Sequence, residues 1–282
     1  MNKTFQANCS RRQLVTQSMA LSFAAAMMPA VGSSIVTTDK DGLDAGEKQF
    51  KSGDFDMLAY CVKPKGKTSL PVVIVVQEIF GLHEHIRDLC RRLAKQGYLA
   101  VAPNLYQRQG DPTKIADINE LIEKVVRQVP DAQVMADLDA CVAQVNTWGG
   151  DDKRIAITGF CWGGRITWLY AAHSTVIKAG VAWYGRLQSA ATALQPQNPI
   201  DLVKQLKAPV LGLYGEADGG IPMDTVNAMR DALMAQGSTS HIVSYPDTPH
   251  GFNADYRDSY RDATAKEAWG KMLRWFEHFG VK

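Results

Sequence analysis

Short apolar runs recur along the chain, and segments with helical periodicity separate them. The runs are rich in β-branched residues and bounded by turn formers, which is typical of strands buried on both faces of a sheet. They lie at 72–76, 98–102, 155–158, 179–184, 210–214 and 241–245. Apolar residues at helical spacing mark 83–96, 118–126, 134–145, 222–236 and 265–279. Strands that alternate with helices predict a doubly wound, mostly parallel α/β sheet.

The segment 46–64 has a different pattern. Apolar residues alternate partly with polar ones on either side of Ser52-Gly53. This pattern predicts an antiparallel hairpin at the edge of the sheet. No linker interrupts the chain after it, so we expect a single domain over 46–282. The polar segment 31–45 contains several Gly and Asp residues and predicts a flexible lead.

Residues 1–30 differ from the rest of the chain. A polar, basic start containing Arg11-Arg12 precedes an apolar run rich in Ala and Met, which ends near Ala30. This order resembles a twin-arginine export signal and predicts a periplasmic or secreted protein. The run is short and interrupted by polar residues, so we expect no stable membrane span in the mature form. A loosely docked N-terminal helix is the alternative.

Composition narrows the function classes. The chain has 282 residues, 46% of them hydrophobic, and a formal net charge of +2, which fits a globular enzyme or binding protein and indicates no nucleic-acid partner. None of the five cysteines forms a CxxC pair. His83 and His85 are two residues apart at the start of a predicted helix, where their side chains diverge, so we expect no metal. We also expect a monomer.

The segment "GFCWGG" (159–164) has the spacing of a nucleophile elbow, G-x-S-x-G, with Cys161 in the serine position. A predicted strand precedes it and a predicted helix follows it, which is the context that the motif requires. Gly159 and Gly163 fit because a Cβ atom there would collide with the neighbouring chain. A helix N-terminus favours a thiolate, and the N–H of Trp162 is placed to bind an oxyanion.

Two later loops supply candidate partners for Cys161. Asp218 follows the run 210–214, and His250 follows the run 241–245. Both loops come after the carboxyl end of a predicted strand, where open α/β sheets place their ligand sites. The order nucleophile, acid, histidine is that of the α/β hydrolases. We therefore predict a Cys161–His250–Asp218 triad.

At these residues the sequence resembles the dienelactone hydrolase family, which is carboxymethylenebutenolidase-like and belongs to the α/β-hydrolase superfamily. The resemblance covers about 46–280 and rests on "QEIFGL" (77–82), "APNLYQRQG" (102–110), "GFCWGG" (159–164), "WYG" (183–185) and "HGF" (250–252). It implies an α/β-hydrolase fold and hydrolysis of a small-molecule ester or enol-lactone through an acyl-thioester. It implies no cofactor.

The resemblance also implies roles for further residues. Glu78 would contact the resting thiol and help to control its ionisation. The N–H of Ile79 would join that of Trp162 as an oxyanion donor. Arg108 would bind a substrate carboxylate, and Tyr184 would form part of the binding wall.

One position departs from the family pattern. Family members that act on dienelactone carry a second arginine four residues after the histidine, and this chain has Ala254 there. Arg257, three residues further on, either reaches the pocket or faces solvent. The altered position leaves a non-catalytic ligand-binding module as an alternative. A thiol redox sensor is a third possibility, because an activated thiolate also oxidises.

Overall fold

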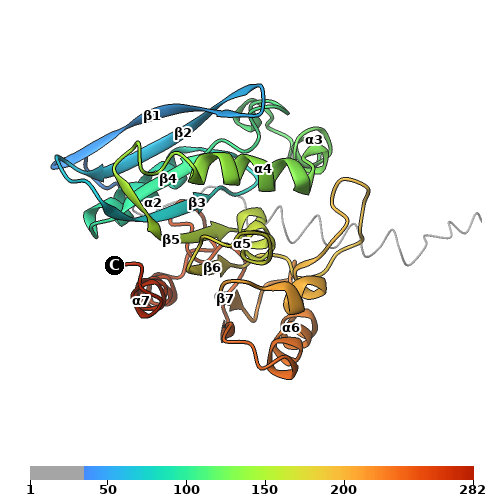
Figure 1. The fold of residues 1–282 in the computed structure, drawn as a ribbon. Helices are drawn as coiled ribbons and strands as arrows, with labels where there is room; N and C mark the ends of the chain where they lie inside the picture. The colour runs from blue at the N-terminus through green and yellow to red at the C-terminus, as the bar shows by residue number, and fades with distance from the viewer. Residues whose placement is uncertain (1–34) are drawn as a thin grey trace, which may run out of the picture.

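The computed structural model describes residues 35–282, and the predicted export signal at 1–30 lies outside them. An eight-stranded sheet with helices on both faces forms the molecule (Figure 1). Its strands are β1 (Leu43–Ser52), β2 (Phe55–Pro64), β3 (Leu70–Val76), β4 (Leu99–Pro103), β5 (Gly150–Phe160), β6 (Ala179–Trp183), β7 (Val210–Gly215) and β8 (His241–Tyr245). The helices are α2 (Glu84–Lys95), α3 (Ile118–Lys124), α4 (Asp131–Val142), α5 (Trp162–His173), α6 (Met223–Ala235) and α7 (Asp262–His278). Short 3₁₀ segments are η1 (Pro112–Lys114), η2 (Val126–Gln128) and η3 (Pro199–Gln205).

The strand order is β1-β2-β4-β3-β5-β6-β7-β8. β2 pairs antiparallel with both β1 and β4, and all other neighbours are parallel. The predicted α/β class and the antiparallel hairpin at the edge are thus confirmed. Parallel strands require crossover connections, and the helices that the sequence predicted supply them.

The hairpin begins earlier than its alternating pattern indicated. β1 starts at Leu43, and the residues before it lie against α2. The backbone N–H of Thr38 donates to Asp88 Oδ1 over 2.6 Å, and Lys95 Nζ lies 2.6 Å from Asp39 Oδ1. The segment 35–45 is therefore not the flexible lead that its polar composition predicted, because its polar groups find partners on a helix.

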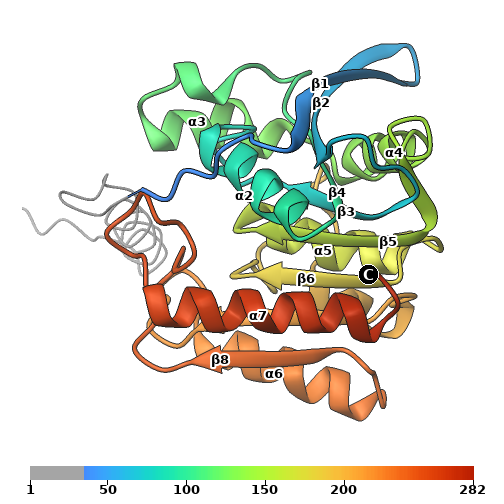
Figure 2. The ribbon, with the colours of Figure 1, turned by 90° about the vertical axis from the view of Figure 1, so that its left-hand side faces the viewer.

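The helices divide between the two faces of the sheet. α2 and α7 cover one face, and α4, α5 and α6 cover the other (Figures 1 and 2). All residues of α5 from Trp162 to Ala172 are buried, because this helix packs over the centre of the sheet and under the neighbouring segments. None of the helices within residues 35–282 combines the length and the apolar character that a membrane-spanning helix requires.

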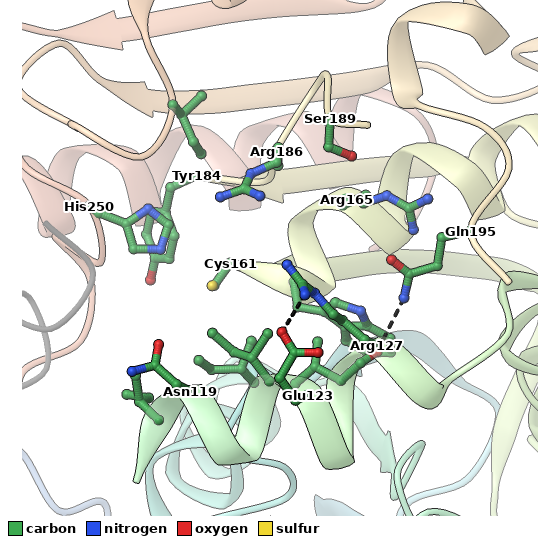
Figure 3. Close-up of a pocket in the computed structure, with 16 residues that line it drawn as sticks. Asn119, Glu123, Arg127, Cys161, Arg165, Tyr184, Arg186, Ser189, Gln195 and His250 are labelled. Atoms are coloured by element: carbon green, nitrogen blue, oxygen red, sulfur yellow. Dashed lines mark hydrogen bonds and ion pairs between the residues drawn. The ribbon is translucent and has the colours of Figure 1, made fainter. Parts of the chain in front are cut away.

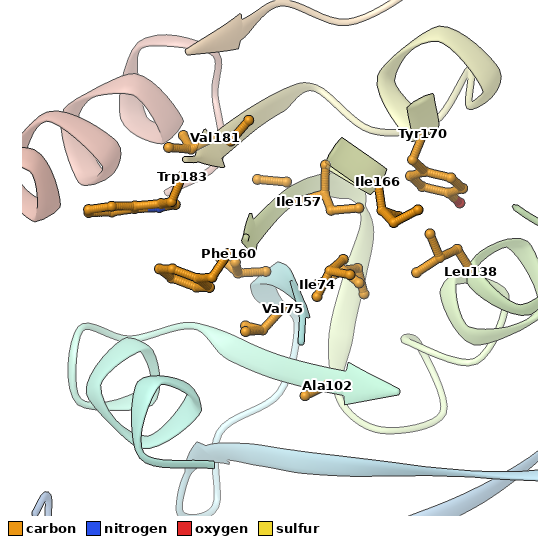
Figure 4. Packing of buried hydrophobic residues seen from close by; sticks show 14 of the residues in the cluster. Ile74, Val75, Ala102, Leu138, Ile157, Phe160, Ile166, Tyr170, Val181 and Trp183 are labelled. Carbon is orange, nitrogen blue, oxygen red and sulfur yellow. The ribbon is translucent and has the colours of Figure 1, made fainter. Parts of the chain in front are cut away.

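The core lies on both sides of the central strands. Residues 72–76 of β3 are fully buried, as their uninterrupted apolar run predicted. Figure 4 shows Ile157 and Phe160 of β5 packed among Ile74, Ile166 and Trp183. A fully buried side chain of this size contributes about 1.5–3 kcal/mol to folding. This packing fixes the strand ends from which the candidate site is built.

Candidate active site

Cys161 occupies a strained turn between β5 and α5. Its backbone has φ 55° and ψ −113°, a conformation that non-glycine residues rarely adopt. A Cβ atom on Gly159 would lie 2.1 Å from the carbonyl oxygen of Gly163, and one on Gly163 would lie 2.5 Å from that of Gln77. The steric reason that the sequence suggested for both glycines therefore holds, and the turn directs the cysteine above the sheet.

His250 and Asp218 are brought together from the ends of different strands. His250 Nδ1 lies 2.6 Å from Asp218 Oδ2. Asp218 Oδ1 accepts hydrogen bonds from the backbone N–H groups of Gly220, over 2.9 Å, and Ile221, over 3.2 Å. Because both carboxylate oxygens have partners, the carboxylate can orient the imidazole ring. The other face of His250 meets Tyr184, with ring centroids 5.0 Å apart.

The charge of His250 follows from its neighbours. Burial disfavours the imidazolium form, but the charge of Asp218 and the hydrogen bonds to Asp218 and Cys161 outweigh it. Together they raise the pKa of His250 from 6.5 to about 10. A protonated imidazole beside the sulfur favours the thiolate form of cysteine, which is the nucleophilic form. The cluster can thus hold a thiolate–imidazolium pair near neutral pH.

Glu78 is a buried carboxylate in a basic and hydroxylic environment. Its Oε2 accepts a hydrogen bond from Tyr256 Oη over 2.8 Å and lies 3.3 Å from a guanidinium nitrogen of Arg257. His83 Nε2 lies 3.5 Å from the same oxygen. Burial alone would raise the pKa of Glu78, but Arg257 and His83 hold it well below its usual range. Glu78 is therefore an anion inside the protein.

The structure answers the question about Arg257. Its side chain is 3% exposed and forms the ion pair with Glu78, so it faces neither solvent nor the cavity beside Cys161. Ala254 is fully buried. The two-arginine arrangement of the family pattern is therefore absent around this cavity.

Arg108, expected at the substrate, lies elsewhere. Its guanidinium pairs with Asp137 of α4, donates to the Ser52 carbonyl over 3.1 Å and stacks over Phe55 at 4.6 Å. It does not line the cavity beside Cys161. Asp137 is fully buried and needs a countercharge, which explains the orientation of Arg108.

A cavity of about 480 Å³ opens beside Cys161 (Figure 3). Five of the predicted site residues line it: Cys161, His250, Tyr184, Ile79 and Trp162. Trp162 is the first residue of α5, and the first N–H groups of a helix lack partners within the helix. The cavity thus joins the thiol, the imidazole and the residues expected to donate to an oxyanion.

The sequence interpretation missed the far wall of this cavity. Arg127, Arg165 and Arg186 line it together with residues of α3. These arginines come from three separate segments and form no linear motif. Only the chain path that follows β6 and α3 brings them to the site.

The other described cysteines are poor candidates for redox partners. Cys61, Cys90 and Cys141 are unpaired and buried. Burial raises the pKa of Cys61 to about 12 and raises the pKa of Cys141 well above its usual value. Thiols of this kind are inert. Within residues 35–282, no group of three or more His, Cys, Asp or Glu side chains is arranged to hold a metal ion.

Comparisons with known proteins agree on one family. The family model described as "Dienelactone hydrolase family" matches residues 57–280. A Methylorubrum extorquens protein named "Putative carboxymethylenebutenolidase" is 51% identical over 98% of this chain and 95% of its own length. A Salmonella typhimurium protein of the same name is 53% identical over 92% of this chain and 96% of its own length.

A solved structure gives the same result. The crystal structure titled "Putative Dienelactone Hydrolase" from Klebsiella pneumoniae superposes with a TM-score of 0.82. It shares 56% sequence identity and covers 83% of this chain and 98% of its own.

Proposed function

The chain belongs to the dienelactone hydrolase family and is a hydrolase of the ester or lactone type, and we propose that it acts through a Cys161–His250–Asp218 triad and an acyl-thioester intermediate. The observation that carries the proposal is the pairing of His250 with Asp218 over 2.6 Å beside a cysteine in the strained elbow position. Nucleophile, base and orienting acid are then in hydrogen-bonding sequence, as in other triads.

Acylation begins from the thiolate–imidazolium pair. Cys161 Sγ forms a bond to the substrate carbonyl carbon, and the carbonyl electron pair moves to oxygen. The N–H groups of Trp162 and Ile79 stabilise this oxyanion, and each such donor typically lowers the barrier by about 3–4 kcal/mol. When the carbonyl re-forms, the C–O bond to the leaving group breaks, and the leaving oxygen takes the proton from His250. In a lactone the leaving oxygen stays attached to the acyl chain.

Deacylation uses the same groups in the opposite order. Neutral His250 removes a proton from water while the oxygen attacks the thioester carbon. Collapse of the second oxyanion breaks the C–S bond, releases the carboxylic acid and restores the thiolate beside the imidazolium. Asp218 stabilises the imidazolium in both halves without being protonated itself.

Glu78 is proposed to control the resting thiol. Its Oε2 receives Tyr256 and Arg257, whereas its buried Oε1 accepts no hydrogen bond from another side chain within residues 35–282. An ionised carboxylate with an open oxygen can accept the proton of the Cys161 thiol before substrate binds. This role follows the family pattern.

Substitution of the nucleophile tests the proposal. Cys161→Ala is expected to abolish turnover of small aryl esters and lactones, whereas Cys61→Ala, in β2, serves as the matched cysteine control and is expected to retain activity. Normal turnover by folded Cys161→Ala would refute the mechanism. Circular dichroism of both variants separates loss of chemistry from loss of fold.

A further inference from the structure

The far wall of the Cys161 cavity has an excess of positive charge. Three arginines line it, Arg127, Arg165 and Arg186, whereas Glu123 is the one carboxylate side chain among its lining residues. A concave surface lined mainly by one sign of charge focuses its field on the ligand. Such a wall is suited to a substrate with an anionic group.

Two of these arginines are engaged by acids. Arg165 makes two parallel bonds to Asp131, of 2.7 and 2.8 Å, and Arg127 pairs with Glu123. These pairs neutralise two of the three guanidinium charges. The positive charge of Arg186 has no counterpart among the carboxylates of the cavity wall.

The backbone that carries Arg186 is held tightly against the elbow. Gly185 precedes it and packs on the first turn of α5, where an added Cβ atom would lie 2.3 Å from the carbonyl carbon of Gly164. Tyr184, the residue before, has a positive φ of 38°. Arg186 is thus anchored within the same packed unit as Cys161, and Figure 3 shows its guanidinium directed into the cavity from the wall that carries Tyr184.

The opposite wall is apolar. Ile118 and Ile122 of α3 and Val126 of η2 line it. A cavity of about 480 Å³ lies within the size range of small-molecule sites, which is roughly 300–1,000 Å³. A ligand that fills it would present apolar surface to α3 and a charged group to the opposite side.

Resting on the proposed hydrolase function, we propose that Arg186 is a specificity-determining residue that binds a carboxylate of the substrate. The substrate class is then an ester or lactone with a carboxylate a few bonds from the scissile carbonyl and an apolar body facing α3. Guanidinium and carboxylate can form two parallel hydrogen bonds, which fix the orientation of the acyl group at Cys161. The charge-recognition role that the sequence indicated for Arg108 thereby passes to another segment of the chain.

A matched pair of substrates tests this proposal. Mono-4-nitrophenyl glutarate carries a carboxylate on its acyl chain, and its methyl ester lacks that charge, while both release 4-nitrophenol. The wild-type enzyme is expected to prefer the acid. Arg186→Gln is expected to lower kcat/KM for the acid roughly 10- to 100-fold, mainly through KM, because hydrogen bonds to charged groups are lost. Turnover of the methyl ester should stay within about twofold.

Two further variants sharpen the result. Arg186→Lys keeps the charge but loses the planar fork, so an intermediate preference for the acid is expected. Arg230→Ala, on α6 and away from the cavity lining, is the matched arginine control and should leave both substrates unchanged. Equal losses on both substrates, no loss on the acid, or a wild-type preference for the methyl ester would each overturn the role of Arg186. Failure of the proposed mechanism has a different signature, which is turnover of both esters by Cys161→Ala.

Discussion

Asp218 determines both the orientation and the charge of His250. Burial by itself would lower the pKa of this histidine, and the charge of Asp218, with further help from Cys161, reverses that effect and raises the pKa to about 10. The same carboxylate fixes the ring through the 2.6 Å contact to Nδ1. One substitution at residue 218 therefore separates the charge from the shape of the site.

Asp218→Asn is expected to lower the pKa of His250 below 6.5, because burial would then act without the opposing charge. Activity should fall by on the order of 10²–10⁴-fold. NMR titration of the His250 imidazole measures the first effect and ester hydrolysis the second. An unchanged His250 pKa in the variant would contradict the electrostatic explanation.

The raised pKa of His250 also predicts how stability depends on pH. The folded state binds the His250 proton more tightly than the unfolded state, whose histidine has a pKa near 6.5. This contribution is fully present below about pH 6.5 and is lost as the pH rises through about 10. Urea unfolding across this window should show a smaller decline for Asp218→Asn than for wild type, with Asp224→Asn as the surface control. Parallel declines for wild type and Asp218→Asn would exclude this contribution.

Glu78 and Arg257 should be strongly coupled in stability. Both side chains are buried, so removing one leaves the other charge without a partner. Glu78→Gln is expected to lower the free energy of unfolding by about 3–5 kcal/mol. The double variant Glu78→Gln/Arg257→Gln should lose less than the sum of the two single variants in urea denaturation. Additive losses would show that the pair does not interact.

At the scale of elements, the turn between β5 and α5 is the tightest packed feature of the site. Gly163 lies against the backbone end of β3, where Val76 O and Gln77 O would each be 2.5 Å from an added Cβ atom. The angle at which β5 passes into α5 depends on this close approach. The elbow is thus a property of two strands and a helix together.

Gly163→Ala is expected to destabilise the protein by on the order of 1–3 kcal/mol and to displace Cys161, with loss of most activity. Gly46→Ala is the matched control, because an added Cβ atom there meets nothing within 4 Å. Thermal unfolding and ester turnover of the two variants check this prediction. Wild-type activity in Gly163→Ala would show that the close packing is dispensable.

The sequence predicted elements better than side-chain partners. Apolar runs such as 72–76 predicted their strands because burial on both faces leaves a local signature. The predicted chain order of Cys161, Asp218 and His250 agrees with their places after β5, β7 and β8. Arg108 and Arg257 could not be placed, since a guanidinium takes whichever buried carboxylate the fold brings near. Asp137 and Glu78 are these carboxylates, and neither is close in sequence to its arginine.

At the scale of the whole molecule, the sheet brings distant segments to one edge. β5, β7 and β8 are parallel or linked through parallel neighbours, so their carboxyl ends point the same way. Cys161 and His250 are therefore neighbours although 89 positions separate them. The edge hairpin β1–β2 stays outside this arrangement and supplies Ser52 and Phe55 to hold Arg108 instead.

Export of the whole molecule is a prediction from residues 1–30 alone. The twin-arginine-like pattern predicts cleavage near Ala30 and a periplasmic or secreted product. N-terminal sequencing of the protein from a periplasmic fraction should find a start near residue 31. Arg11→Lys/Arg12→Lys should retain the uncleaved chain in the cytoplasm. An intact Met1 on the exported protein would contradict the cleavage.

The acyl-enzyme tests the central claim most directly. Wild-type protein mixed with an aryl ester and quenched in acid within the first turnovers should gain the mass of the acyl group. Peptide mass spectrometry should place that mass on Cys161 as a hydroxylamine-sensitive thioester. His250→Ala should accumulate less acyl-enzyme because acylation slows. Rapid turnover with no acyl group on Cys161, or with the acyl group on another residue, would contradict the thiol mechanism.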